Sequence, residues 1–97
     1  MKKDLLKLLD LTSEDILEIL DTADRLKAMK KAGIPHPFLE GKTLAMIFEK
    51  SSTRTRVSFE TGIYQLGGNA IYLSDKDSQI GRNEPVQDTA RVLSRFC

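Results

Sequence analysis

The hydrophobic pattern between residues 43 and 73 changes its period twice, and this constrains the fold more than any other feature. Thr43 to Phe48 is a short apolar run, typical of a buried parallel strand. A helix is expected near Thr53 to Leu66, with one face formed by Phe59, Ile63 and Leu66. Gly67-Gly68 ends that helix, and Ala70 to Leu73 is a second apolar strand. This order predicts a right-handed unit of two parallel strands, which places ligands at the carboxyl edge of the sheet.

A hydroxyl-rich turn with two arginines, Ser51 to Arg56, lies between the first strand and the helix. The first N–H groups of a helix lack intrahelical partners, so such a turn attracts anions. The helix dipole contributes only about 0.3–1 kcal/mol, whereas each hydrogen bond to a charged group contributes about 1.5–3 kcal/mol. Directed donors should therefore decide the affinity. They are the hydroxyls of Ser52, Thr53 and Thr55 and the guanidinium of Arg54.

The two arginines of this turn should have different partners. Residues at i and i+2 of a helix point about 200° apart, so Arg54 and Arg56 should not share one ligand. We expect Arg54 to bind the anion and Arg56 to pair with a structural carboxylate. On residue type alone, an ordinary helix cap at Ser52 with two solvated arginines is an equally good interpretation. The chain has no Gly-x-x-x-x-Gly-Lys motif, which excludes a nucleotide P-loop.

The run Phe48 to Glu60, with Ser-Thr-Arg-Thr-Arg at its centre, resembles the carbamoyl phosphate signature of ornithine and aspartate carbamoyltransferases. The resemblance continues through Leu66-Gly67-Gly68, Ser78 to Gly81 and Asp88 to Arg95, and so covers most of the chain from Gly41 onward. In the second loop, ornithine-type enzymes carry Gln where aspartate-type enzymes carry Lys. This chain has Gln79, which favours the ornithine branch.

The resemblance implies transfer of a carbamoyl group from carbamoyl phosphate to the δ-amino group of ornithine, giving citrulline and phosphate. It implies that the phosphate is bound by Ser52, Thr53, Arg54 and Thr55, that Arg54 stabilises the leaving dianion, and that Thr55 lies near the carbonyl oxygen. It also implies a homotrimer in which Gln79 reaches the neighbouring subunit's site. The reaction needs no metal and no cofactor.

The composition limits the other classes of function. The chain has 97 residues, 40% of them hydrophobic, and a net charge of +1, so neither nucleic acid nor membrane is expected as a partner. The single cysteine, Cys97, allows no internal disulfide and suits a reducing cytoplasm. We expect a cytoplasmic protein.

The remaining elements are two helices and an N-terminal segment. Lys3 to Leu11 is leucine-rich and predicts either an extended arm or one helical turn. A helix is expected from Ser13 to Ala32, because Thr12 can cap it and Gly33 can end it. A third helix should begin near Glu84-Pro85 and run to the chain end, with one face formed by Val86, Thr89, Ala90 and Leu93.

Together these elements predict an α/β fold, an open parallel sheet with flanking helices. We expect residues 1–97 to be the N-terminal portion of a carbamoyl phosphate-binding domain, without the amine-substrate domain. The chain alone should then form no citrulline. Three alternatives stay open: a carbamoyltransferase for putrescine, acetylornithine or aspartate, a non-catalytic anion-binding fragment, and a nucleic-acid-binding piece that uses Arg54 and Arg56. The low aromatic content, 6%, argues against the last.

Overall fold

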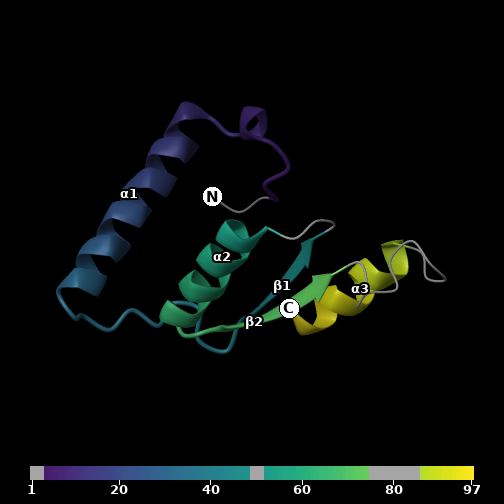
Figure 1. Cartoon of the computed structure of the whole chain (residues 1–97). Coiled ribbons are helices and arrows are strands. Elements are labelled where there is room, and N and C mark those ends of the chain that lie inside the picture. Colours follow the sequence, from purple (N-terminus) through teal and green to yellow (C-terminus); the bar gives the residue numbers. More distant parts are fainter. Residues whose placement is uncertain (1–3, 49–51, 75–85) are drawn as a thin grey trace. The chain divides into compact units, whose positions relative to one another are not determined.

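The computed structural model describes residues 4–48, 52–74 and 86–97 (Figure 1). The chain divides into two compact units, residues 1–36 and 37–97. The first unit holds a short 3₁₀ turn, η1 (Leu8–Asp10), and the helix α1 (Ser13–Lys31). The second unit holds β1 (Thr43–Phe48), α2 (Thr53–Gln65), β2 (Asn69–Ser74) and α3 (Val86–Phe96).

Both ends of α1 are closed by local hydrogen bonds. The Thr12 hydroxyl accepts from the Asp15 N–H at 3.0 Å, and an Asp15 carboxylate oxygen accepts from the Thr12 N–H at 3.1 Å, which is a capping box. At the other end Gly33 adopts φ +71°, and the Ile34 N–H donates to the Met29 carbonyl at 2.9 Å. This left-handed ending is a Schellman motif. The predicted start is confirmed, and the helix ends one residue earlier than predicted.

Thr12→Ala should destabilise α1 by about 1 kcal/mol, because it removes the acceptor for the Asp15 N–H and opens the capping box. Thermal unfolding followed by circular dichroism at 222 nm measures the loss of helix. Thr22→Ala is the matched control, since the exposed Thr22 hydroxyl contacts only its own helix: it donates to the Glu18 carbonyl and accepts from Arg25 at 3.5 Å. That change should leave α1 unchanged or up to about 0.5 kcal/mol more stable, because alanine is the better helix former. Identical unfolding curves for the two variants would contradict the role of the cap.

β1 and β2 form a parallel two-stranded sheet, and α2 connects them, as the sequence predicts. The register pairs Thr43 with Asn69 at one end and Phe48 with Ser74 at the other. β2 is one residue longer at each end than the predicted strand. Because the strands are parallel and in this register, the chain leaves both of them at the same edge of the sheet.

α2 packs on the face of the sheet that carries Ala70 and Tyr72. Met46, which pairs with Tyr72, is 4% exposed, and Ile63 of α2 is 8% exposed. The predicted helical face is only partly correct, because Leu66 is half-buried and Phe59 is 54% exposed. Two strands lie only about 5 Å apart and are too narrow to cover the whole stripe of a helix.

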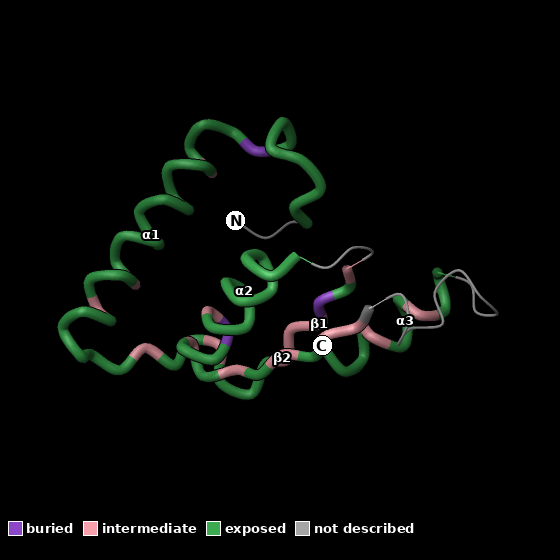
Figure 2. Tube along the Cα trace, viewed as in Figure 1, coloured by how far each residue is buried: buried purple, intermediate pink, exposed green. Residues whose placement is uncertain are grey.

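The prediction that β1 is buried is confirmed for the side chains on one face of the sheet. The opposite face carries Ile47 and Ile71, which are 45% and 39% exposed, and the half-buried Ala45 and Leu73, so it is partly open in the part of the chain that the structure describes. Among the described residues, the buried apolar side chains are Leu11, Met46 and Ile63, coloured purple in Figure 2. An open sheet with so small a core is what the sequence predicts for an incomplete α/β domain.

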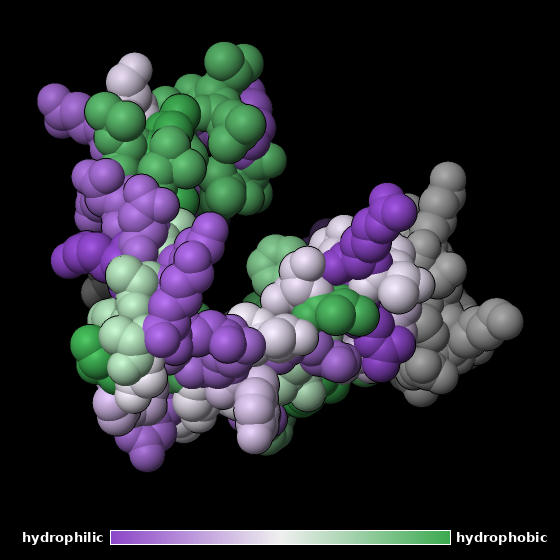
Figure 3. Space-filling view, turned by 60° about the vertical axis from the view of Figure 1, so that its left-hand side comes forward, coloured by the Kyte–Doolittle hydropathy of each residue, from purple (hydrophilic) through white to green (hydrophobic). Residues whose placement is uncertain are grey.

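The helices α1 and α3 keep most of their apolar side chains exposed. No residue of α1 is buried, and exposed leucines gather over the segment that precedes it and over its first turns (Figure 3). On the predicted face of α3, Thr89 and Leu93 are half-buried, whereas Val86 and Ala90 are exposed. The predicted start of this helix at Glu84-Pro85 lies outside the described residues. No helix among the described residues is long and apolar enough to cross a membrane.

Candidate functional site

The start of α2 collects the donors that the sequence predicts. The first hydrogen bond of the helix runs from the Arg56 N–H to the Ser52 carbonyl at 2.9 Å. The N–H groups of Thr53, Arg54 and Thr55 precede this bond and therefore have no acceptor within the helix. β1 ends at Phe48, so these groups lie just beyond the carboxyl edge of the sheet. The structure thus brings Ser52, Thr53, Arg54 and Thr55 together.

The polar side chains at this helix start are not used to cap it. Ser52 is the N-cap residue, with φ −141° and ψ 90°, but its hydroxyl makes no capping hydrogen bond, unlike that of Thr12 at the start of α1. All four residues from Ser52 to Thr55 are exposed. The Arg54 guanidinium has no hydrogen bond or ion pair with any residue that the structure describes. Four exposed residues, three of which have N–H groups without an intrahelical acceptor, therefore lie together at one end of one helix.

Arg56 has a different environment. Its Nε lies 3.3 Å from Oε1 of Glu60, one turn further along α2, and its Cζ lies 3.8 Å from the centre of the Tyr72 ring. The predicted structural carboxylate is therefore Glu60, and that prediction is confirmed. An exposed i,i+4 ion pair is worth about 0.3–0.5 kcal/mol, and a cation–π contact about 0.5–1 kcal/mol, so the aromatic contact is the larger of the two.

Tyr72 also contacts the end of β1. The rings of Phe48 and Tyr72 pack edge to face, with centroids 5.5 Å apart and planes at 83°. From the sequence, Tyr72 is predicted only as a strand residue, and this contact is not predicted. The sequence feature that could have predicted the contact is the two-residue period of the strands. Once Met46 is paired with Tyr72, Phe48 and Tyr72 lie on the same face as diagonal neighbours.

Gln79, the fifth predicted site residue, lies outside the described residues. The structure does describe the end of β2 at Ser74, whose backbone pairs with Phe48. The chain therefore leaves β2 at the edge of the sheet where α2 begins. Gln79 stays a prediction.

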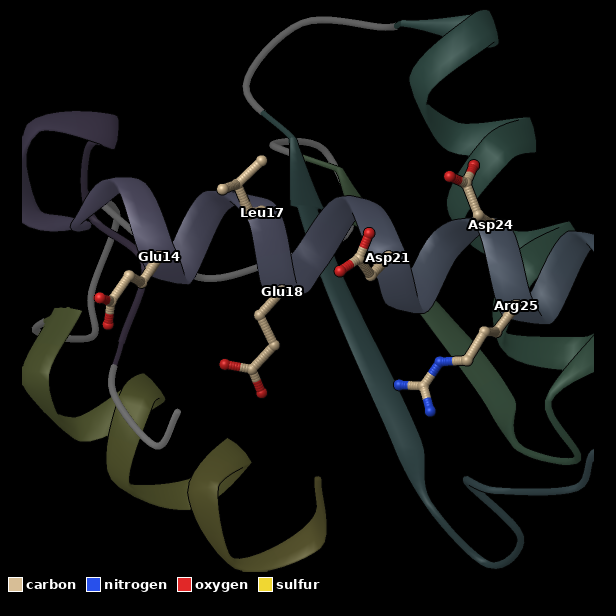
Figure 4. Close-up of a pocket in the computed structure, with 6 residues that line it drawn as sticks. All are labelled: Glu14, Leu17, Glu18, Asp21, Asp24 and Arg25. Carbon is tan, nitrogen blue, oxygen red and sulfur yellow. The ribbon is translucent and has the colours of Figure 1, made fainter.

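A shallow hollow along α1 is lined by residues of that helix alone, shown in Figure 4: Glu14, Leu17, Glu18, Asp21, Asp24 and Arg25. Its four carboxylates and single guanidinium disfavour an anion. The side chains of Glu18 and Asp24 point away from each other, so they do not converge on one ligand. Nor do the described residues include a group of His, Cys, Asp or Glu side chains that could hold a metal ion. The start of α2 is the better candidate site.

Comparison with known proteins gives consistent matches over the whole chain. Residues 3–97 match the family model described as aspartate/ornithine carbamoyltransferase, carbamoyl-P binding domain. The ornithine carbamoyltransferase of Methanocorpusculum labreanum is 62% identical over 96 residues, which are 99% of this chain and 32% of that protein. The corresponding enzyme of Halalkalibacterium halodurans is 60% identical over 94 residues, which are 97% of this chain and 30% of that protein.

Solved structures agree with this result. The ornithine carbamoyltransferase of Pyrococcus furiosus superposes with a TM-score of 0.92 at 58% identity, over 97% of this chain and 30% of that one. The catalytic subunit of M. jannaschii aspartate transcarbamoylase superposes with a TM-score of 0.88 at 42% identity, over 99% of this chain and 32% of that one. The chain thus spans about a third of the length of these relatives.

Proposed function

The chain belongs to the aspartate/ornithine carbamoyltransferase family, as part of its carbamoyl phosphate-binding domain, and we propose that it binds carbamoyl phosphate at the start of α2 for transfer to ornithine. One observation carries this proposal. The Ser52 hydroxyl, the Arg54 guanidinium and the N–H groups of Thr53 to Thr55 share one helix end and have no capping or intrahelical partner. A phosphate with charged oxygens on several sides matches such a set of donors.

The proposed chemistry uses these donors to stabilise developing charge. The lone pair of the δ-amino group attacks the carbonyl carbon of carbamoyl phosphate and forms a tetrahedral oxyanion. The bond from that carbon to the phosphate oxygen then breaks, phosphate leaves with the electron pair, and the nitrogen loses a proton. Arg54, Ser52 and Thr53 hold the phosphate, and Thr55 donates to the carbonyl oxygen as its charge grows.

Ornithine is the amine that the observations favour. Identity to the ornithine enzymes reaches 62%, against 42% for the aspartate enzyme, and Gln79 occupies the position where aspartate-type enzymes carry Lys. The family resemblance further supports a cytoplasmic homotrimer in which Gln79 completes the neighbouring subunit's site. Sedimentation of the assembled enzyme tests the trimer, and a stable monomer with full activity would contradict it.

Grafting provides the test of activity. When this chain replaces the matching segment of the Pyrococcus furiosus ornithine carbamoyltransferase, the chimaera should form citrulline from ornithine and carbamoyl phosphate. A colorimetric citrulline assay measures the product. The amine is bound by the host's own domain, so the experiment tests whether this chain supplies a working carbamoyl phosphate site. A folded chimaera that forms no citrulline would contradict that role.

Thr55→Ala in the same chimaera separates catalysis from binding. Removal of one donor to the oxyanion should lower kcat by about 100-fold. The KM for carbamoyl phosphate should change much less, since the phosphate keeps its other donors. Ser58→Ala is the matched control, because the Ser58 hydroxyl donates to the Arg54 carbonyl within the helix, at 2.8 Å. A change confined to KM would assign Thr55 to phosphate binding alone.

A further inference from the structure

One aromatic ring contacts the chain on both sides of the candidate anion site. Phe48, the last residue of β1, packs its ring edge to face on Tyr72. The Arg56 guanidinium, on the other side of residues 52–55, lies 3.8 Å from the centre of the same ring.

The Arg56 guanidinium is held in two directions at once. Its Cζ lies 3.8 Å from the centre of the Tyr72 ring, and its Nε pairs with Glu60 at 3.3 Å. A guanidinium suits both contacts, because it carries N–H donors at the edge of a planar cation. The contact with the ring links the start of α2 to β2.

The start of α2 needs such an attachment because it has no side-chain cap. At α1 the Thr12–Asp15 capping box ties down the first turn. At α2 the Ser52 hydroxyl makes no capping bond, which leaves it available to a ligand. A helix end without a cap frays, and frayed N–H groups must be ordered again when the anion binds. Tyr72 contacts Phe48, which precedes residues 52–55, and Arg56, which follows them.

We propose that Tyr72 is a positioning residue of the anion site, which holds the first turn of α2 in its binding geometry through Phe48 and Arg56. The inference rests on the proposed function only for the identity of the anion. The order that Tyr72 gives to the first turn of α2 is measurable without any ligand.

The test compares Tyr72→Leu, which removes the ring, with Tyr72→Phe, which keeps it. Tyr64→Leu is the matched control, since Tyr64 of α2 is 78% exposed. The free chain is measured by amide hydrogen exchange at Arg56, whose N–H bonds to the Ser52 carbonyl, and then titrated with carbamoyl phosphate by NMR. Tyr72→Leu should speed exchange at Arg56 and raise the Kd, each by about tenfold, because it removes the cation–π and the aromatic contact together. Tyr72→Phe should restore both values to near those of the unchanged chain.

The outcomes separate the inference from the proposed function. Equal exchange rates and equal Kd values for Tyr72→Leu and the unchanged chain would overturn the positioning role and leave the function intact. An unchanged chain that binds no carbamoyl phosphate, with Arg56 exchange still accelerated by Tyr72→Leu, would overturn the function and support the positioning role.

Exchange at Ile63, in the buried part of α2, reports general unfolding. If Tyr72→Leu accelerates exchange there as well, Arg56→Lys becomes the deciding variant, because it keeps the charge but loses the planar guanidinium and its Nε–H. The inference then requires a Kd raised by about fivefold. An unchanged Kd for Arg56→Lys would overturn it.

Discussion

Arg54→Ala is expected to weaken carbamoyl phosphate binding by roughly 30- to 150-fold. Hydrogen bonds to charged groups contribute about 1.5–3 kcal/mol each, and loss of the guanidinium should cost about 2–3 kcal/mol, because serine and threonine donors can compensate only in part. The folded chain should be unaffected, since this guanidinium has no partner among the residues that the structure describes. NMR titration of the chain measures the Kd, and thermal unfolding measures the stability.

Arg25→Ala is the charge-matched control for this experiment. It removes one guanidinium from α1, in the other compact unit. There the Nη2 of Arg25 lies 3.5 Å from the Thr22 hydroxyl. If the net charge of the chain governs affinity, both variants should weaken binding equally. The proposed role of Arg54 predicts a change of less than twofold for Arg25→Ala. An unchanged Kd for Arg54→Ala would mean that other residues bind the phosphate.

Gly68→Ala should destabilise the second unit by about 1–3 kcal/mol, the typical cost of inserting atoms into a filled space. A Cβ at residue 68 would lie 2.8 Å from the Lys42 carbonyl oxygen and 2.9 Å from Cδ1 of Ile63. The Lys42 oxygen belongs to the backbone and accepts from the Asn69 N–H at 3.0 Å, so it cannot move without straining the start of the sheet. Urea unfolding followed by circular dichroism measures the difference.

Gly62→Ala is the matched control, and its effect should have the opposite sign. A Cβ at residue 62 meets no atom within 4 Å. Gly62 lies inside α2, where alanine is favoured over glycine by about 0.5–1 kcal/mol, so this variant should be more stable than the unchanged chain. If Gly68→Ala were as stable as Gly62→Ala, the close packing of residue 68 against Lys42 and Ile63 would be wrong.

The elements that the sequence predicts well are those whose signals are local. Both ends of α1 depend on residues close to the ends themselves, Thr12 with Asp15 and Gly33 with Ile34. The bounds of β1 are correct because the apolar run stops at Phe48, where the charged residues Glu49 and Lys50 follow. The assignment of Arg56 to a carboxylate follows from the direction of side chains around a helix, and Glu60 is the partner one turn away.

The features that the sequence misses depend on which distant residues become neighbours. Phe59 has the correct spacing for a buried face, but the sheet that the described residues form beneath α2 has two strands and leaves Phe59 exposed. Tyr72 resembles any aromatic strand residue until the register places it diagonally opposite Phe48 and beneath Arg56. The donors at the start of α2 are predictable from residue type, but the lack of a capping bond from Ser52 is not, because serine is also a common helix cap.

The central claim is that the start of α2 binds carbamoyl phosphate. A two-dimensional amide NMR spectrum of the isotopically labelled chain tests it most directly, recorded with carbamoyl phosphate and, as the control, with inorganic phosphate. We expect dispersed peaks in which the amides of Ser52, Thr53, Arg54 and Thr55 shift on titration, and shift further for carbamoyl phosphate than for phosphate. A dispersed spectrum in which these four amides stay in place, or in which the shifts map to α1, would contradict the claim.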